Sequence, residues 1–473
     1  MLIYLFVIVF LIFRLYLLVN IYPGADEIWT VFLTDYSYQE ILTATLSDTI
    51  GPGYFLFIKA IFSVFRVEIT LVNLRVISLF FAACGSWMIY RLSNYLYSKK
   101  TAQFALFLIL ILPSFIWISV NARYYSYLMF LSAATLFIFL KLLKKSSLTN
   151  ILLFVFASLI GIYTHYYFLI LVFVFALYLL TKRMLFKNEW KIVFTSISLA
   201  ISPLLYYFFT FPKPRISVIQ NNFFKIPGFF LSNLSSFQVL VYLNSIRLTI
   251  FNFLIVAGLA LSGLYLFILG IRSIKGDYKK LFLLILFLPP VLLGIFSYYV
   301  RPALALNSLL IFCVPQIILI ARGVSVNWRG NKLATIFFAL ILILSNIPFV
   351  KSFQSAKDFA RPYYFVNKQT KPDDVSIHAD LYTYLGAKYY LPNLAHLGVA
   401  PSIFNSQIES VHGYIIMAKD EIYKKDRIWY FEPVYFNIRE ARLFKKYLDE
   451  NWEVKFSEKF SEANLVVYLY EKK

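Results

Sequence analysis

The sequence predicts a polytopic α-helical membrane protein with about eleven transmembrane helices and a small C-terminal α/β domain. Of the 473 residues, 60% are hydrophobic and only 15% are charged, whereas about a quarter of the residues are charged in soluble domains. Many apolar runs reach the roughly 20 residues that a helix needs to cross the hydrocarbon layer. Because these runs are continuous rather than alternating, they favour helices over strands.

The apolar runs predict the spans, and the basic loops predict their orientation. We expect spans at residues 2–20, 71–95, 101–119, 124–143, 149–164, 166–183, 191–210, 248–271, 280–299, 303–322 and 333–350. Most basic residues between spans fall on one side if the N-terminus is cytoplasmic, in agreement with the positive-inside rule. An odd number of spans in the plasma (inner) membrane then makes the C-terminal domain extracytoplasmic. The first run lacks a basic n-region and a cleavage site, so we expect a retained span.

The net charge of +21 does not indicate a nucleic-acid partner. Residues 1–357 contain 29 Lys and Arg against 8 Asp and Glu, whereas residues 358–473 contain 16 of each kind. The excess lies mostly in short loops between spans, where it orients a membrane protein. Membrane lipids, and no nucleic acid, are therefore the expected partners. Cys84 and Cys313 both lie inside apolar runs and predict no disulfide.

A change of composition near residue 350 predicts two domains. Residues 1–350 form the transmembrane domain, with long outer loops at 21–70 and 211–247, and residues 351–473 form the extracytoplasmic α/β domain. GPGYFLFIKAIFSVF at 51–65 is too short for a span and predicts a helix lying at the membrane interface. In the tail, VSIHADL, RIWYFEP and LVVYLY predict strands, and NIREARLFKKYLDENW predicts a helix.

The distribution of carboxylates restricts where acid–base chemistry can occur. Between Glu68 and Asp358 the only acids are Glu189 and Asp277, both in predicted inner loops. Proton and cation transporters usually carry carboxylates inside their spans, so this distribution weighs against transport. On the outer face of the transmembrane domain, the available acids are Asp26, Glu27, Asp35, Glu40, Asp48 and Glu68.

The pair Asp26–Glu27 follows the first predicted span directly. A carboxylate at the membrane surface loses part of its hydration, which raises its pKa and makes it a better general base. Asp26 and Glu27 are therefore the candidate catalytic residues. An ordinary helix N-cap or a hydrated interfacial acid would give the same sequence pattern.

Four cations on the outer side are candidates for binding a phosphate group. Arg123 is the only charged residue between the third and fourth spans, and Arg301 occupies the equivalent position between the ninth and tenth. A guanidinium suits bidentate phosphate binding. Arg75 leads the second span, and Lys59 lies on the predicted interfacial helix. Each of these side chains could instead extend its charge to the lipid head groups.

Aromatic and imidazole side chains lie close to these cations in the sequence. Tyr124 and Tyr125 follow Arg123 directly, and His165 in GIYTHYYF lies at the end of the fifth span. Tyr124, Tyr125 and His165 are therefore candidate substrate-binding residues, with His165 able to hydrogen-bond a phosphate or a sugar. A histidine satisfied by its surroundings at the interface is the alternative. The other histidines have no ligand spacing, so no zinc site is predicted.

Several stretches, in order along the chain, resemble the GT-C glycosyltransferases, specifically the group around the protein O-mannosyltransferases and the aminoarabinose transferase of lipid A. The acidic pair after the first span is one of them. The others are GPGYFLF, LVNLRVISLFFAACGSWMIYRLSNYLYSKKTA, NARYYSYLMFLSAATLFIFL, YTHYYFLILV and KPDDVSIHADLYTYLGAKYYLP. The chain departs from the family at Thr49-Ile50-Gly51, where members often have His or Lys before the proline.

The resemblance implies an inverting glycosyltransferase acting on the outer face of the membrane. Its donor would be a sugar on a polyprenyl phosphate, and its acceptor a hydroxyl of a lipid, glycan or protein. Asp26 matches the family's catalytic base and Glu27 its neighbour. No cofactor is required, and a divalent cation would find at best a weak site completed by Asp48 or Glu68. A transporter or flippase of lipid-linked saccharides and a non-catalytic scaffold are the alternatives.

Overall fold

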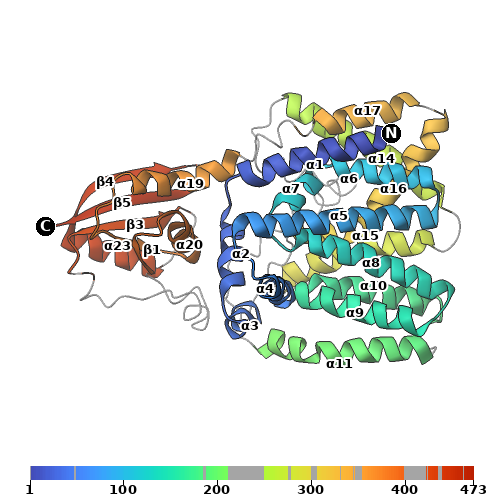
Figure 1. Cartoon of the computed structure of the whole chain (residues 1–473), viewed down its shortest axis with the longest axis horizontal. Coiled ribbons are helices and arrows are strands. Elements are labelled where there is room, and N and C mark those ends of the chain that lie inside the picture. Colours follow the sequence, from blue (N-terminus) through green and yellow to red (C-terminus); the bar gives the residue numbers. More distant parts are fainter. Residues whose placement is uncertain are drawn as a thin grey trace. The chain divides into compact units, whose positions relative to one another are not determined.

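The computed structural model divides the chain into two compact units (Figure 1). It describes residues 2–46, 50–184, 188–210, 250–274, 278–299, 306–330, 332–344, 346, 354–398, 422, 424–434, 439–461 and 463–473. The helical unit comprises Met1–Val19, Thr45–Ile58 and Val72–Val350, and the C-terminal unit comprises Asn20–Ala44, Lys59–Leu71 and Lys351–Lys473. The outer loop at 21–70 is thus shared between the units, whereas the sequence assigned it wholly to the transmembrane domain, because much of this loop packs with the tail.

Helices make up the helical unit. Their bounds are α1 (Leu2–Asn20), α4 (Gly53–Phe65), α5 (Leu71–Leu96), α6 (Lys99–Ile111), α7 (Pro113–Val120), α8 (Tyr125–Lys144), α9 (Leu148–Thr164), α10 (Tyr167–Thr181), α11 (Asn188–Thr210), α14 (Ile250–Arg272), α15 (Tyr278–Tyr299), η2 (Leu306–Phe312), α16 (Val314–Gly330) and α17 (Lys332–Leu344). Among the described residues, α5, α8 and α15 are each long and apolar enough to cross a membrane, and α6 and α7 pass the same test as a bent pair. The total of about eleven spans stays a prediction.

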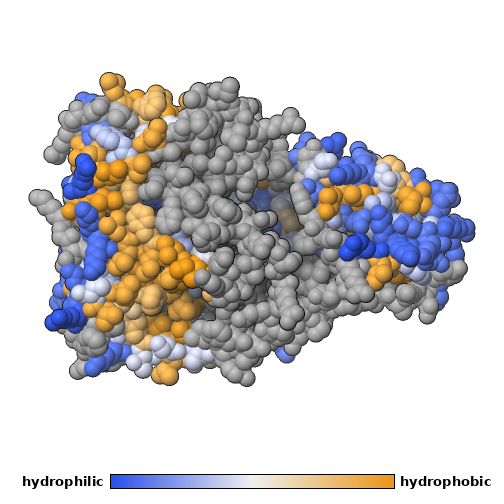
Figure 2. All heavy atoms as spheres, turned by 180° about the vertical axis from the view of Figure 1, so that it is seen from behind, coloured by the Kyte–Doolittle hydropathy of each residue, from blue (hydrophilic) through white to orange (hydrophobic). Residues whose placement is uncertain are grey.

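Large apolar side chains cover the outside of the helical unit. Ile12, Phe80, Phe156 and Leu340 are each more than half exposed. Figure 2 shows hydrophobic residues spread over the described face of this unit, with hydrophilic residues along its edge. Such a broad apolar surface is rare on a soluble monomer, and it suits contact with lipid chains.

The third predicted span, 101–119, is bent rather than straight. Its two helices, α6 and α7, meet at an angle of 66°, because Pro113 has no N–H group and clashes with the preceding turn. The proline also leaves the carbonyl of Ile109 without its usual helical donor. Arg14 of α1 compensates, since its Nη2 lies 3.5 Å from Ile109 O and 3.1 Å from Leu110 O. A buried arginine within the first apolar run thus stabilises a break in another helix.

The tenth predicted span, 303–322, has different bounds in the structure. A 3-10 helix, η2, comes first, and α16 begins at Val314 and continues beyond the predicted end. Pro315 lies in the first turn of α16, where a missing N–H group costs nothing. The later part of α16, ARGVSVNWRG, is too polar to be recognised as a span from hydropathy. The predicted interfacial helix is found as α4, whereas loop 211–247 lies outside the described residues.

The tail folds into a five-stranded mixed sheet with the order β2-β1-β3-β5-β4. Its elements are α19 (Gln354–Asn367), β1 (Val375–His378), α20 (Leu381–Tyr390), β2 (Ala395–Gly398), β3 (Arg427–Pro433), α23 (Arg439–Asn451), β4 (Trp452–Phe460) and β5 (Leu465–Lys472). Strand β1 runs parallel to β2 and β3, whereas β5 runs antiparallel to β3 and β4. The sequence identified β1, β3, β5 and α23 but not the shorter or more polar elements between them.

The central strand β3 is buried on both faces. Ile428 and Tyr430 belong to one core cluster, and Trp429 and Phe431 belong to the other. A strand covered on both sides has a continuous apolar sequence rather than an alternating one. The buried indole N–H of Trp429 donates to Asp374 Oδ2 at 2.9 Å, so this tryptophan has a packing role.

The C-terminal unit also contains two helices of the first outer loop. They are α2 (Ala25–Asp35) and α3 (Tyr38–Leu46), of which α2 carries the acidic pair. Ile28 of α2 is fully buried in a cluster with Tyr384 and Leu385 of α20. The acidic pair therefore lies on a helix that packs against the α/β domain.

Candidate functional site

Arg123 lies in the turn between α7 and α8. Its backbone N–H donates to Asn121 O at 2.7 Å, which closes the turn, and its side chain is only 5% exposed. The guanidinium carbon lies 5.2 Å from the centre of the Tyr124 ring and 6.0 Å from that of Tyr125. Aromatic faces attract cations, so the two tyrosines hold a positive charge in a nearly water-free setting. A charge in such a setting would interact strongly with an anionic ligand.

His165 lies in the turn between α9 and α10. The backbone N–H of Tyr167 donates to its Nδ1 at 3.2 Å, which assigns the imidazole proton to Nε2. Burial and the charge of Arg123 lower the pKa of His165 to about 3, so the ring is neutral near pH 7. Its ring centre lies 5.3 Å from that of Tyr124. A neutral histidine beside the Arg123 turn can donate a hydrogen bond from Nε2.

The segment before α4 runs directly against the His165 turn. Ile50 and His165 form an antiparallel bridge, and the Gly51 N–H donates to Thr164 O at 3.1 Å. A Cβ atom at Gly51 would lie only 2.0 Å from Tyr163 O. The backbones therefore approach too closely at this position for any residue other than glycine, which explains Gly51 in the GPG stretch at the start of α4.

Tyr54 and Ser78 complete the surroundings of the Arg123 turn. The buried Tyr54 ring contacts the Tyr124 ring edge-on, with centres 6.2 Å apart. Ser78 Oγ of α5 donates to Arg123 O at 3.4 Å. Neither residue was identified from the sequence, although the aromatic residue directly after Gly-Pro-Gly was an indication for Tyr54. Three segments that are distant in the sequence thus meet in the helical unit. They are the segment at the start of α4, the turn between α7 and α8, and the turn between α9 and α10.

Arg75, another of the predicted phosphate-binding cations, has a partner within the helical unit. The buried Arg75 donates from Nη1 to Leu18 O at 2.8 Å, which satisfies a carbonyl in the last turn of α1. This contact is structural, and a role for Arg75 in phosphate binding stays a prediction. Arg301 lies outside the described residues.

Asp26 and Glu27 lie in the first turn of α2, where the helix dipole favours negative charge. Asp26 is exposed, whereas Glu27 is only 3% exposed. Successive helical residues point about 100° apart, so the two adjacent acids lie on different faces. The predicted loss of hydration therefore applies to Glu27 and not to Asp26.

Lys59 interacts with the other end of α2. Its Nζ lies 3.2 Å from Asp35 O and 3.5 Å from Thr34 O, where a cation complements the C-terminal end of a helix dipole. The predicted site residues thus divide between the units. Arg75, Arg123, Tyr124, Tyr125 and His165 belong to the helical unit, and Asp26, Glu27 and Lys59 belong to the C-terminal unit.

A metal site does not emerge from the described part of the chain. No group of three or more His, Cys, Asp or Glu side chains is found there that could hold an ion. Asp48 lies outside the described residues, so a weak divalent-cation site that includes it stays a prediction.

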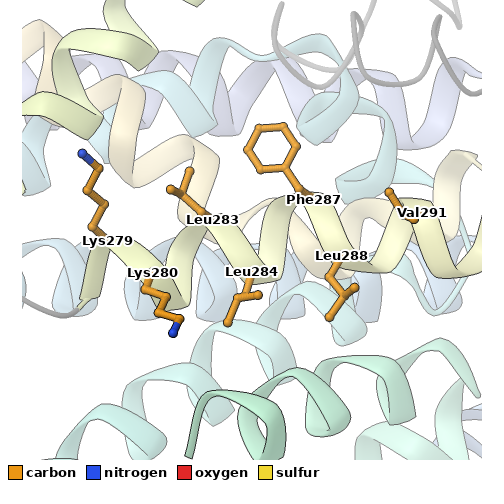
Figure 3. Close-up of a pocket in the computed structure, with 7 residues that line it drawn as sticks. All are labelled: Lys279, Lys280, Leu283, Leu284, Phe287, Leu288 and Val291. Carbon is orange, nitrogen blue, oxygen red and sulfur yellow. The ribbon is translucent and has the colours of Figure 1, made fainter. Parts of the chain in front are cut away.

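A groove of about 690 Å³ runs along α15. Figure 3 shows two rows of side chains along its borders, with successive members one helical turn apart and a lysine at the start of each row. The lining residues are Lys279, Lys280, Leu283, Leu284, Phe287, Leu288 and Val291. No acid is among these described lining residues.

A family profile matches the part of the chain that contains the Arg123 and His165 turns. Residues 50–207 match the family described as dolichyl-phosphate-mannose-protein mannosyltransferase. The matched segment begins after the acidic pair. None of the curated proteins matches the chain.

Solved structures extend the similarity to nearly the whole chain. ArnT from Cupriavidus metallidurans in the apo state has a TM-score of 0.60 at 12% identity, with 98% of this chain and 97% of that chain covered. ArnT bound to undecaprenyl phosphate has a TM-score of 0.57 with the same identity and coverage. The Archaeoglobus fulgidus oligosaccharyltransferase, tethered with an acceptor peptide, reaches only 0.49 at 12% identity, with 99% and 74% covered. The chain has the ArnT fold, and the resemblance to the GT-C group is confirmed.

Proposed function

We propose that the protein is an inverting glycosyltransferase that moves a sugar from a polyprenyl-phosphate donor to a hydroxyl acceptor on the outer face of the plasma membrane. The family profile and the ArnT fold support this class of reaction, and the ArnT structure with undecaprenyl phosphate supports the kind of donor. The acceptor is a lipid, a glycan or a protein. The comparisons give no support to a transporter.

In the proposed reaction, Asp26 accepts the proton of the acceptor hydroxyl. The acceptor oxygen forms a bond to the anomeric carbon while the bond from that carbon to the phosphate oxygen breaks. The electron pair leaves with the polyprenyl phosphate, and a single displacement inverts the anomeric centre. We assign the base to Asp26 because it matches the catalytic base of the GT-C group, and its side chain is exposed.

Arg123 and His165 act on the leaving group in this proposal. As the phosphate leaves, its negative charge increases, and a guanidinium held in a water-poor setting stabilises it. The neutral His165 donates a hydrogen bond to a phosphate or sugar oxygen from Nε2. The observation that carries the proposal is the buried Arg123, which lies near the rings of Tyr124 and Tyr125, with the buried His165 beside Tyr124.

Release of polyprenyl phosphate by the purified protein tests the proposal. The donors are undecaprenyl-phosphate mannose and undecaprenyl-phosphate aminoarabinose, and a native membrane extract supplies the acceptors. Asp26→Asn should reduce turnover about 10³-fold, because a general base contributes roughly 10²–10⁴-fold. Asp35→Asn is the matched control, since it removes an exposed charge from the other end of the same helix, and it should retain turnover.

Full turnover in Asp26→Asn would show that the assigned base is wrong. If neither donor is consumed but the protein moves a lipid-linked saccharide across vesicle membranes, and Asp26→Asn does so equally well, the protein is a flippase. An active wild-type protein with an inactive Asp26→Asn supports the transferase.

A further inference from the structure

The N-terminal end of α2 has no side-chain cap. Its N-cap residue is Gly24, which has no side chain that could accept a hydrogen bond from the first turn. The N–H groups of Glu27 and Ile28 both donate to Gly24 O, at 3.0 and 3.1 Å. Contacts that hold Pro23 and Gly24 from outside the helix therefore help to set the position of the acidic pair.

Tyr390 at the end of α20 supplies such a contact. Its hydroxyl donates to Pro23 O at 3.1 Å, across 367 residues of sequence. The Tyr390 ring is itself fixed, because it stacks on Tyr363 with centres 5.4 Å apart and contacts Tyr364 edge-on at 5.5 Å. A donor held by aromatic neighbours defines where the chain enters α2.

The faces of α2 and α20 that meet continue this contact along the helix. Ile28 is fully buried and packs with Tyr384 and Leu385. One turn later, the Phe32 ring lies under the ammonium group of Lys388, 5.1 Å from the ring centre. These contacts fix α2 along its length and, because Ile28 adjoins Glu27, they fix the turn that carries both acids.

We propose that α20 positions the catalytic carboxylate, and that Tyr390 is the positioning residue closest to it. This inference rests on the proposed function of Asp26. A general base must lie within hydrogen-bond reach of the proton that it removes, and a displacement of about 1 Å can reduce the rate about 10²-fold. The C-terminal domain thus contributes to the reaction through the orientation of α2.

The variant Tyr390→Phe tests the inference because it removes the donor hydroxyl and keeps the ring. Loss of one hydrogen bond should lower kcat about 5- to 10-fold, and the KM for the polyprenyl-phosphate sugar should change less than about twofold because no phosphate ligand is altered. The control Tyr468→Phe removes a hydroxyl of the same domain that accepts from Lys445 Nζ at 2.7 Å, and its kcat should be unchanged.

Amide hydrogen exchange gives a second measurement that does not depend on turnover. In Tyr390→Phe, the amides of Glu27 and Ile28 should exchange about 5- to 10-fold faster, while the amides of β3 keep their protection and show that the domain is folded. Unchanged exchange in the first turn of α2 would overturn the inference.

Comparison with Asp26→Asn separates this inference from the proposed function. If Asp26→Asn is inactive and Tyr390→Phe keeps the kcat of the wild type, the positioning role is wrong and the proposed base stands. If Asp26→Asn keeps full turnover, the assignment of Asp26 as the general base is wrong, and the positioning role of Tyr390 is then wrong as well. A kcat loss in Tyr390→Phe that is matched by Tyr468→Phe would also overturn the inference, because the effect would then be general to the domain.

Discussion

The two units of the chain satisfy their arginines in different ways. In the helical unit, Arg14 and Arg75 donate to backbone carbonyls. In the C-terminal unit, Arg427 pairs with Asp374 at 3.1 Å and with Glu471 at 3.4 Å. The sequence explains the contrast, since residues 1–357 contain few acids and residues 358–473 contain equal numbers of acids and bases.

This difference shows how the same residue type serves two purposes. A carbonyl oxygen accepts the hydrogen bonds of an arginine without carrying a formal charge. A carboxylate also carries a compensating charge, so Arg427 is less available to a ligand. In the helical unit these contacts join one helix to the backbone of another, whereas Arg427 joins β3 to β5 through Glu471.

The largest expected effect comes from a matched pair of glycines, one in each unit. Gly51→Ala would place a Cβ atom 2.0 Å from Tyr163 O, whereas a Cβ atom at Gly24 meets nothing within 4 Å. Gly51→Ala should lower the free energy of unfolding by about 4 kcal/mol, because two backbones must separate. Gly24→Ala should cost less than about 1 kcal/mol. Thermal unfolding in detergent checks both values, and equal losses would contradict the close approach at the His165 turn.

A smaller effect is expected from the arginine beside Tyr124 and Tyr125. Arg123→Gln should lower kcat/KM for the polyprenyl-phosphate donor about 100-fold, which corresponds to about 2.7 kcal/mol, through both a lower kcat and a higher KM. The kcat/KM of Arg123→Lys should lie between that of the wild type and that of Arg123→Gln, because lysine keeps the positive charge but loses the planar guanidinium. The control Arg91→Gln removes an exposed guanidinium that lies over the Trp87 ring, and its kinetics should match the wild type. An unchanged kcat/KM in Arg123→Gln would contradict phosphate binding by Arg123.

The smallest effect concerns pH and the C-terminal unit. Burial lowers the pKa of His396 to about 4 and the pKa of His378 well below its usual value of 6.5. The unfolded chain then binds more protons below pH 6.5, so stability is present above that pH and decreases as the pH falls towards the folded pKa values. The loss is about 1.4 kcal/mol per pH unit for each histidine. Burial raises the pKa of Asp380, which opposes this loss at lower pH.

Urea unfolding followed by Trp429 fluorescence at pH 7 and pH 5 measures this slope. His396→Asn should remove about half of the pH dependence and leave the remainder to His378. A free energy of unfolding that rises as the pH falls from 7 to 5 would contradict the conclusion that His378 and His396 are buried in their neutral form.

Some of the site could be predicted because its features are local in the sequence. Arg123 stands alone between two apolar runs with two tyrosines beside it, and Asp26 and Glu27 directly follow another run. Long apolar runs and isolated charges indicate which segments are buried. These patterns can be recognised in one segment without knowledge of the rest of the chain. The same local patterns predicted α4 and the central strand of the tail.

Other features depended on contacts between distant segments. Nothing in the first apolar run indicates that Arg14 would satisfy carbonyls next to Pro113, although Pro113 itself is a local signal for the bend between α6 and α7. Hydropathy also gave no indication that Ile28 of α2 would pack with Tyr384 and Leu385 of α20.

The sequence by itself determined that the protein is a membrane-embedded helical bundle with an acidic pair, isolated arginines and a charged α/β tail, because apolar runs, charge and short motifs are properties of neighbouring residues. The tertiary structure alone decided that Gly51 lies against Tyr163, that Glu27 rather than Asp26 is buried, and that Tyr390 holds the start of α2. The physical reason is that hydrogen bonds and packing across hundreds of residues arise only when the chain is folded.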